Sequence, residues 1–505
     1  MKTKSSAESG GLLMYVVFIL SVLAAIVAAV VRPVSDEYLN TFRASGWQEA
    51  LLAAESGIDL AMVQLKSNLR QIQPGNTSSW PSPWDPAVYG DQLSGSAAWP
   101  SPWAQPASGG EQYNITNLSY AGQDGGTMTA TVTVDAPALA VDPTYKTQYY
   151  RIRSSGIAPL PPLKRAGGTT QDLDLRRYSL QVDRYSMLNG VTPVPALAYP
   201  QVFRTVEAIA QPLSSFANAL LARNQISMSD QNVVVDSYDS TNAAKSTNGQ
   251  YDPGKAQKNA TVSTDGTLIA AENTQINGNL NAHNGAATGA ANATGTISND
   301  FYQDIPSVQA PVWTTFSATP ASVGASTTLT SSASSTAPQR YKLSAIMLAG
   351  SNTLTITGTP GQNTYVEIWV AGNVSLAGNA SIQTDPGVYV PLYIGGSLDL
   401  GGNGLQTGNG YTDERPAKDL IYLIQPPAGQ SQTVSLHSNA NMESAVYAPD
   451  AAVTIGGGSN GTFSGSVVGS TISITGVTNV HYDESLSHAG FVTSFKIVSW
   501  MEDTR

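Results

Sequence analysis

Two pairs of carboxylates are the residues of this chain that could most directly support chemistry. Asp236 lies shortly before Asp239, and Asp483 lies directly before Glu484. Paired carboxylates can act as acid and base in sugar cleavage, or they can bind calcium. Asp and Glu also accept backbone hydrogen bonds at turns. Neighbouring positions in sequence do not fix the separation of two carboxylates in space, and we favour the structural role because Asp so often serves turns.

The histidines and serines give no stronger signal. The four histidines are His283, His437, His481 and His488, and none belongs to an H-E-x-x-H pattern. The stretch Gly457–Gly461 matches G-x-S-x-G, but a nucleophile elbow joins a strand to a helix, whereas this stretch lies between two expected strands. Cysteine is absent, which excludes thiolate nucleophiles and Cys-zinc sites. We therefore expect no catalytic residue, no cofactor and no metal site.

An enzyme is the alternative, in the form of a membrane-tethered polysaccharide lyase or hydrolase. Such an enzyme needs a cleft with convergent carboxylates and basic or aromatic subsites. The C-terminal half contains few Lys, Arg or Trp residues from which to build one. Nucleic acid is not expected as a partner either, because the net charge is −11 and the pI is near 4.8.

The elements that would position these residues begin with a membrane anchor at Leu12–Val31. This run has no charge, proline or glycine, and a helix of that length spans about 30 Å, the thickness of a bilayer core. Lys2 and Lys4 should hold the N-terminal tail in the cytoplasm. The chain after Arg32 is then expected in the periplasm or at the cell surface, attached to the inner membrane by a single pass. A cleaved secretory peptide is the alternative, but its apolar region is usually only about 7 to 15 residues long.

An extended amphipathic helix is predicted at 36–73, after a brief interruption at Pro33. Its apolar residues recur at steps of three and four, which draws one stripe along a helix. They are Leu51, Ala54, Ile58, Ala61, Leu65 and Leu69.

The centre of this helix is rich in small residues and carries a family resemblance. It consists of Ala53, Ala54, Glu55, Ser56, Gly57 and Ile58. Together with the rest of Gln48–Leu65, it resembles the segment after the membrane helix in the PilX-type minor pilin family. The resemblance implies that Ala53, Ala54, Glu55, Gly57 and Ile58 dock the helix into a pilus-like assembly, where small residues let helices approach closely. A helix that packs only on its own domain is the alternative.

The leader departs from the pilin pattern. Processed type IV pilins have a glycine at the cut and a glutamate five residues later, whereas Val16 lies five residues after Gly11. The resemblance therefore does not carry over to leader cleavage.

The segments 74–112 and 113–212 have different characters. The first is a Trp/Pro-rich loop with two WPSPW copies, at Trp80–Trp84 and Trp99–Trp103, which could bind a ligand or cover the flank of their own domain. The second alternates with a period of two, for instance in Thr127–Val134, and predicts a pilin-like antiparallel sheet next to the helix.

The segment 213–490 predicts a solenoid. Short apolar strands recur about every twenty residues and are followed by Gly- and Asn-rich corners. A Ser/Thr-rich stretch at 314–340 lacks the pattern and is expected to be a loop, and 491–505 is expected to form a C-terminal strand and tail. The motifs VDSYDS (Val235–Ser240) and HYDESL (His481–Leu486) resemble a domain of unassigned function at the C-terminus of pilus-assembly-like envelope proteins. That resemblance covers about 216–486 and implies a right-handed parallel β-helix.

These features predict a mainly β protein in which an anchored pilin-like part carries a β-helix outside the cytoplasm. We interpret it as a structural or assembly protein of a type IV pilus or secretion-type apparatus, without catalysis. Its expected partners are the lipid bilayer and pilin-like proteins or the assembly machinery, with surface polysaccharide as a further candidate.

Overall fold

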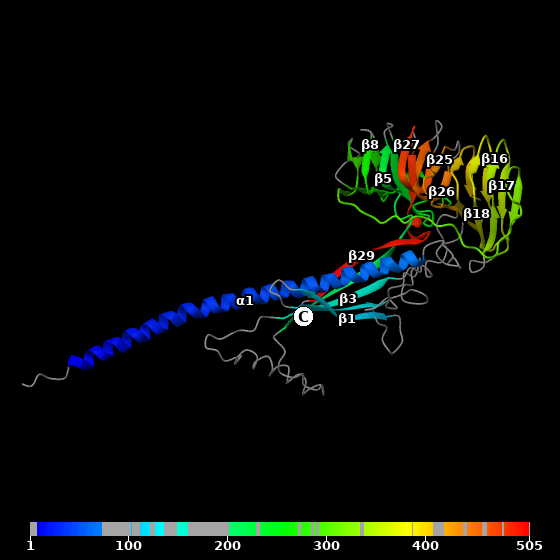
Figure 1. Ribbon diagram of the computed structural model, residues 1–505. Coiled ribbons are helices and arrows are strands. Elements are labelled where there is room, and N and C mark those ends of the chain that lie inside the picture. The colour runs from blue at the N-terminus through cyan, green and yellow to red at the C-terminus, as the bar shows by residue number, and fades with distance from the viewer. Residues whose placement is uncertain are drawn as a thin grey trace, which may run out of the picture.

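The computed structural model describes residues 8–72, 103, 112–121, 127–135, 149–159, 201–228, 233–270, 274–283, 287–288, 292–333, 338–385, 387–407, 419–437, 442–456, 462–476 and 479–503. A long N-terminal helix leads to an antiparallel sheet, and a parallel solenoid lies beyond the far end of that helix (Figure 1). The two WPSPW copies, apart from Trp103, and the G-x-S-x-G stretch lie outside the described residues.

The helix α1 (Glu8–Ile72) is continuous over 65 residues, so the expected interruption at Pro33 is wrong. A proline removes one backbone donor and crowds the preceding turn, but the regular hydrogen bonds on both sides carry the helix through this position. All its described side chains from Met14 to Val30 are exposed. By length and hydropathy, none of the helices formed by the described residues qualifies as a membrane span.

The second half of α1 covers one face of a five-stranded antiparallel sheet, which we call the head. Its strands follow the order β1 (Gln112–Ala121), β2 (Thr127–Asp135), β3 (Tyr150–Pro159), β4 (Gln201–Ser214) and β29 (Val492–Asp503). Alternate residues of β2 are buried beneath the helix, as its period of two predicts. The fifth strand comes from the end of the chain, although local pattern had placed the whole sheet within 113–212.

The solenoid is inserted between the last two strands of the head. Ser214, at the end of β4, is paired with Val492, at the start of β29, and the amide of Ser215 donates to the carbonyl of Phe491 at 2.8 Å. The chain therefore leaves the head and returns to it at adjacent positions. We call this two-stranded connection the neck.

The strands of the solenoid fall into two sets. The first set comprises β5 (Leu220–Met228), β6 (Val234–Tyr238), β7 (Val262–Thr264), β8 (Thr267–Ala270), β9 (Gln275–Ile276), β10 (Leu280–Ala282), β11 (Ala287–Thr288), β12 (Asn292–Ala293) and β13 (Ile297–Ser298). The second set comprises β14 (Thr327–Thr330), β15 (Gln339–Leu343), β16 (Ile346–Leu348), β17 (Thr353–Thr357), β18 (Thr364–Val370), β19 (Val374–Leu376), β20 (Ser381–Thr384), β21 (Val388–Ile394), β22 (Leu398–Leu400), β23 (Gly404–Thr407), β24 (Asp419–Leu423), β25 (Thr433–Leu436), β26 (Met442–Gly456), β27 (Thr462–Thr475) and β28 (Asn479–Asp483). Two short 3-10 helices, η2 (Pro253–Lys255) and η3 (Glu484–His488), complete the elements.

The rungs are not stacked in chain order. β5 pairs in parallel with β27, and β6 pairs with β28, so the first rung of the solenoid lies directly on the last one. From this junction the first set extends to one end of the stack, and the second set forms the other end (Figure 1). The chain therefore enters and leaves the stack at an interior rung. All strand pairs of the solenoid are parallel, which confirms the mainly β, solenoid-like prediction.

The prediction that 314–340 is a loop outside the solenoid is wrong. It contains β14, which pairs with β17 and forms one edge of a four-stranded sheet. Leu329 is buried, whereas Thr328 and Thr330 are exposed. A short strand with one inward apolar residue can join the stack because the neighbouring rung supplies the rest of the core, and such a strand leaves little periodic signal in the sequence.

Candidate functional site: the face of the long helix and the solenoid seam

Of the five residues predicted to form an assembly surface, four are buried inside the head. Ala53, Ala54 and Ile58 are at most 1% exposed, and Gly57 is buried as well. Glu55 is half-buried at the margin of this face. The small residues do allow a close approach, but the partner is the chain's own sheet.

Two glycines fix how closely the helix approaches. A Cβ at Gly57 would overlap the Ser154 hydroxyl of β3, and a Cβ at Gly156, also on β3, would overlap the Ala50 carbonyl of α1. At Gly156 backbone therefore meets backbone, and at Gly57 the helix backbone meets the side chains of Ser154 and Val132, so neither position has space for a side chain. The prediction that Ala53, Ala54 and Gly57 pack against neighbouring helices of an assembly is thus corrected, because their side of α1 is already covered.

The opposite side of α1 carries exposed apolar residues. Leu52 is 55% exposed and Val63 is 61% exposed. Trp47 is 48% exposed but lies on the sheet side of the helix, where the guanidinium of Arg204 on β4 is 5.3 Å from the centre of its ring and forms an ion pair with Glu502 on β29. Sequence reasoning had concentrated on the buried stripe and missed Leu52 and Val63.

The second candidate site is the seam between β6 and β28, where the two motifs of the C-terminal resemblance meet. VDSYDS and HYDESL are far apart in sequence, yet His481 is in register with Asp236, Tyr482 with Ser237, and Asp483 with Tyr238. Both predicted carboxylate pairs therefore lie at this seam.

A buried aspartate–histidine pair is the centre of the seam. Asp236 Oδ1 and His481 Nδ1 are 2.5 Å apart, and both side chains are 6% exposed. The hydroxyl of Tyr251 donates to Asp236 Oδ2 at 2.7 Å, and its ring stacks on the His481 ring at 3.5 Å. Burial, followed by the hydrogen bond to Asp236, raises the pKa of Tyr251 well above its ordinary value. Both oxygens of Asp236 are thus occupied by partners from the same chain.

The carboxylates of the second pair have structural partners. Asp483 accepts hydrogen bonds from the amides of Ser240 and Ser485, and so caps η3. Burial raises the pKa of Asp483, although these hydrogen bonds oppose the shift. Glu484 binds Lys245 at 2.8 Å and accepts from Asn259 at 2.8 Å.

Asp239, the remaining carboxylate, accepts from the amide and hydroxyl of Thr241 at a turn. Within the part of the chain that the structure describes, no group of His, Asp and Glu residues is arranged to hold a metal ion. The hydrogen bonds and ion pairs of the seam can join its two rungs and hold the loop that contains Tyr251 and Lys245 against these rungs.

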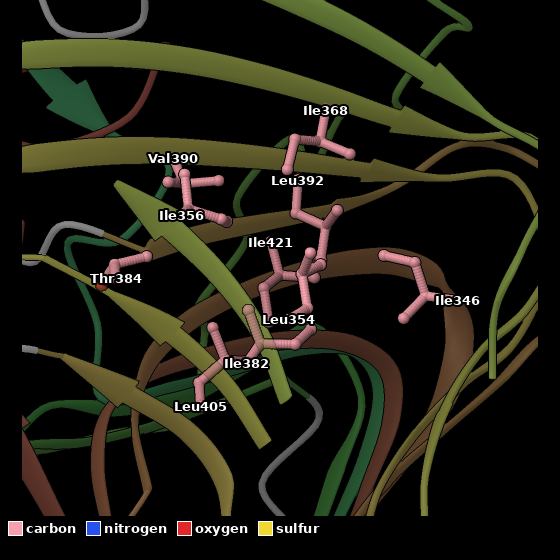
Figure 2. Close-up of a pocket in the computed structure, with 10 residues that line it drawn as sticks. All are labelled: Ile346, Leu354, Ile356, Ile368, Ile382, Thr384, Val390, Leu392, Leu405 and Ile421. Atoms are coloured by element: carbon pink, nitrogen blue, oxygen red, sulfur yellow. The ribbon is translucent and has the colours of Figure 1, made fainter. Parts of the chain in front are cut away.

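A small cavity of about 10 Å³ lies inside the solenoid, away from the seam. Figure 2 shows that its lining side chains point toward one another from strands between β16 and β24. Ten residues line it, and Thr384 is the one that is not aliphatic. The other nine are Ile346, Leu354, Ile356, Ile368, Ile382, Val390, Leu392, Leu405 and Ile421. An enclosed apolar space of this size is a packing gap, since a ligand site would need far more volume and convergent polar groups.

The fold thus defines a protein in which a helix-on-sheet head carries an inserted parallel β-solenoid. A family model described as a domain of unknown function (DUF7305) matches residues 322–489. The match includes HYDESL, but it begins after VDSYDS, so the resemblance expected over 216–486 is matched by a family model only from residue 322 onward. A search of curated proteins found no match.

Among solved structures, the chain is similar to the crystal structure of the competence-associated pilin ComZ from Thermus thermophilus. The identity is 11% and the TM-score is 0.22, over 90% of this chain and 97% of that chain. A superposition at this TM-score carries no argument about fold or function.

Proposed function

We propose that this protein is a membrane-anchored, pilin-like structural or assembly protein that displays a β-solenoid outside the cytoplasm, as part of a type IV pilus or secretion-type apparatus. The observation that carries the proposal is the division of α1. One half of this continuous helix packs on the head sheet, whereas the other half extends away from the protein with exposed side chains.

Lipid is the environment that suits the free half of α1. The side chains of Leu20, Leu23 and Ile26 are each more than half exposed, and no charge lies between Leu12 and Val31. Exposed apolar surface of this extent is unfavourable in water and favourable in a bilayer. The anchor would place the helix parallel to other membrane-anchored helices, in a single-pass topology with the head and solenoid on the outer side of the inner membrane.

Pilin-like chains are the partners we propose for the outward side of α1. Leu52 and Val63 lie three turns apart on the side opposite the head sheet and are exposed. A neighbouring helix that ran alongside α1 would cover both residues. The docking residues we propose are therefore these outward ones, and the buried alanines serve to hold α1 on its own head.

We propose no catalysis for the solenoid. The four carboxylates that sequence reasoning considered for chemistry already bind backbone amides, hydroxyls, Lys245 or His481. The cavity found among the described residues is apolar and enclosed. Both observations favour a structural solenoid over a lyase or hydrolase.

Two experiments test the proposal. After washing with alkaline carbonate, the intact chain should remain in the membrane pellet, and full release of the intact chain would contradict the anchor.

The double variant Leu52→Lys, Val63→Lys should lose co-purification with pilin-like chains while its circular dichroism stays unchanged. Ala256→Lys adds a charge at an exposed position of the solenoid, away from α1, and should retain the partners. Equal recovery with both variants would count against docking through α1.

A further inference from the structure

A group of aromatic and basic side chains lies at the end of the solenoid formed by the second set of strands. Lys342 on β15 is in register with Trp369 on β18, so the two side chains are neighbours on adjacent rungs. Trp313 and Phe316 belong to the segment that returns from the first set of strands to β14. We call Trp313, Phe316, Arg340, Lys342 and Trp369 the aromatic–basic patch.

The patch is held together by ring contacts. Lys342 Nζ lies 3.9 Å from the centre of the Trp369 ring and 5.4 Å from that of Phe316. The guanidinium of Arg340 lies 5.5 Å from the centre of the Trp313 ring, which meets Trp369 edge to face at 6.0 Å. Phe316 is 41% exposed, and Lys342 and Trp369 are half-buried. Two aromatic surfaces therefore flank one accessible ammonium group.

The patch retains polar groups that could bind a ligand. Among the described residues no carboxylate forms an ion pair with Lys342, although the ammonium group has three N–H donors. Arg340 forms an ion pair with the buried carboxylate of Glu367 through Nε at 2.7 Å.

Charge and shape indicate the kind of partner. The protein carries a net charge of −11, whereas this patch places Lys342 and the paired Arg340 beside the exposed ring of Phe316 and the half-buried ring of Trp369. A partner with carboxylates would be attracted locally, and sugar C–H faces pack well on aromatic rings. None of the patch residues lines the cavity described above, and Phe316 and Lys342 are accessible from the surface. A surface suits an extended polymer better than a small molecule.

We propose that the aromatic–basic patch binds an acidic polysaccharide of the uronate class, with its carboxylates on Lys342 and Arg340 and its sugar rings against Phe316 and Trp369. Single-stranded nucleic acid is the competing partner for aromatic and basic residues, but it needs a basic groove that follows several phosphates. The proposal goes beyond the proposed function, because binding by the purified protein does not require an anchor or an assembly.

The test is binding of the purified full-length protein to polygalacturonate, with neutral dextran and oligothymidylate as comparison polymers, by isothermal titration calorimetry. Binding to polygalacturonate alone is expected, and Lys342→Gln should weaken it about tenfold, as expected for the loss of one cation contact. Phe316→Ala should weaken it as well, without a change of charge. Lys258→Gln removes an exposed lysine elsewhere on the solenoid and should have no effect.

Each other outcome overturns the proposal. Absence of polygalacturonate binding, equal binding of dextran, or tighter binding of oligothymidylate would each refute the assignment of the partner. Unchanged affinity in both Lys342→Gln and Phe316→Ala would refute the assignment of the site. Neither result depends on carbonate extraction or co-purification, so this proposal can fail while the proposed function stands, and the reverse also holds.

Discussion

The buried pair at the seam gives the sharpest prediction. Asp236→Ala should remove the partner of His481 and the acceptor of Tyr251 in one step. Hydrogen bonds to a charged group contribute about 1.5 to 3 kcal/mol each, and Asp236 makes two of them, with His481 and Tyr251. We therefore expect a loss of about 3 kcal/mol or more, because His481 would stay buried without its hydrogen-bond partner.

The chain contains a matched control for this prediction. Asp399 and His437 form the same kind of pair at 2.6 Å, but their side chains are 50% and 51% exposed. Exposed ion pairs contribute at most about 1 kcal/mol. Asp399→Ala should therefore have a small effect, and the contrast between the two variants isolates burial from the chemistry of the pair.

Hydrogen exchange is the suitable measurement, because the head and the solenoid need not unfold in one step. In Asp236→Ala, amides of β6 and β28 should exchange at least a hundredfold faster, since each 1.4 kcal/mol corresponds to a factor of ten. Asp236→Asn keeps an acceptor for Tyr251 and should lose less. Exchange in Asp236→Ala that matches that of Asp399→Ala would refute the reasoning that the seam holds the first and last rungs together.

Three further predictions concern the head, the stack and alkaline pH. Gly156→Ala should detach α1 from the sheet, because the new methyl group would overlap the Ala50 carbonyl; a melting temperature within 2 °C of wild type, measured on the full-length chain, would contradict this. Ile394→Asp places a charge in a fully buried position of a rung, and proteolysis should then cleave the solenoid before the head. Burial raises the pKa of Tyr238 and of Tyr251 above that of an unfolded tyrosine, so stability is complete below pH about 10 and is lost as the pH rises further. Tyrosinate absorbance and circular dichroism should change together in an alkaline titration, and full ionisation near pH 10 in a folded protein would exclude this linkage.

Local features of the chain were readable from the sequence because they depend on backbone geometry. Strict alternation in Thr127–Val134 predicted a strand with one buried side, and β2 has that pattern. Rungs such as Tyr365–Val370 and Tyr389–Ile394 were recognisable by their apolar runs between Gly- and Asn-rich corners. The small residues around Ala54 correctly indicated a close approach, since only small side chains allow it.

The partner of each surface was decided by the tertiary structure. A small-residue stripe fits any close partner, so the sequence could not distinguish a neighbouring helix from β3, which meets α1 at Gly156. The pairing of β29 with β4 across the whole solenoid, and of His481 with Asp236, joins segments whose local patterns contain no information about each other. Strands pair in the arrangement that buries apolar surface most favourably over the entire chain. The sequence of a single segment does not reveal that arrangement.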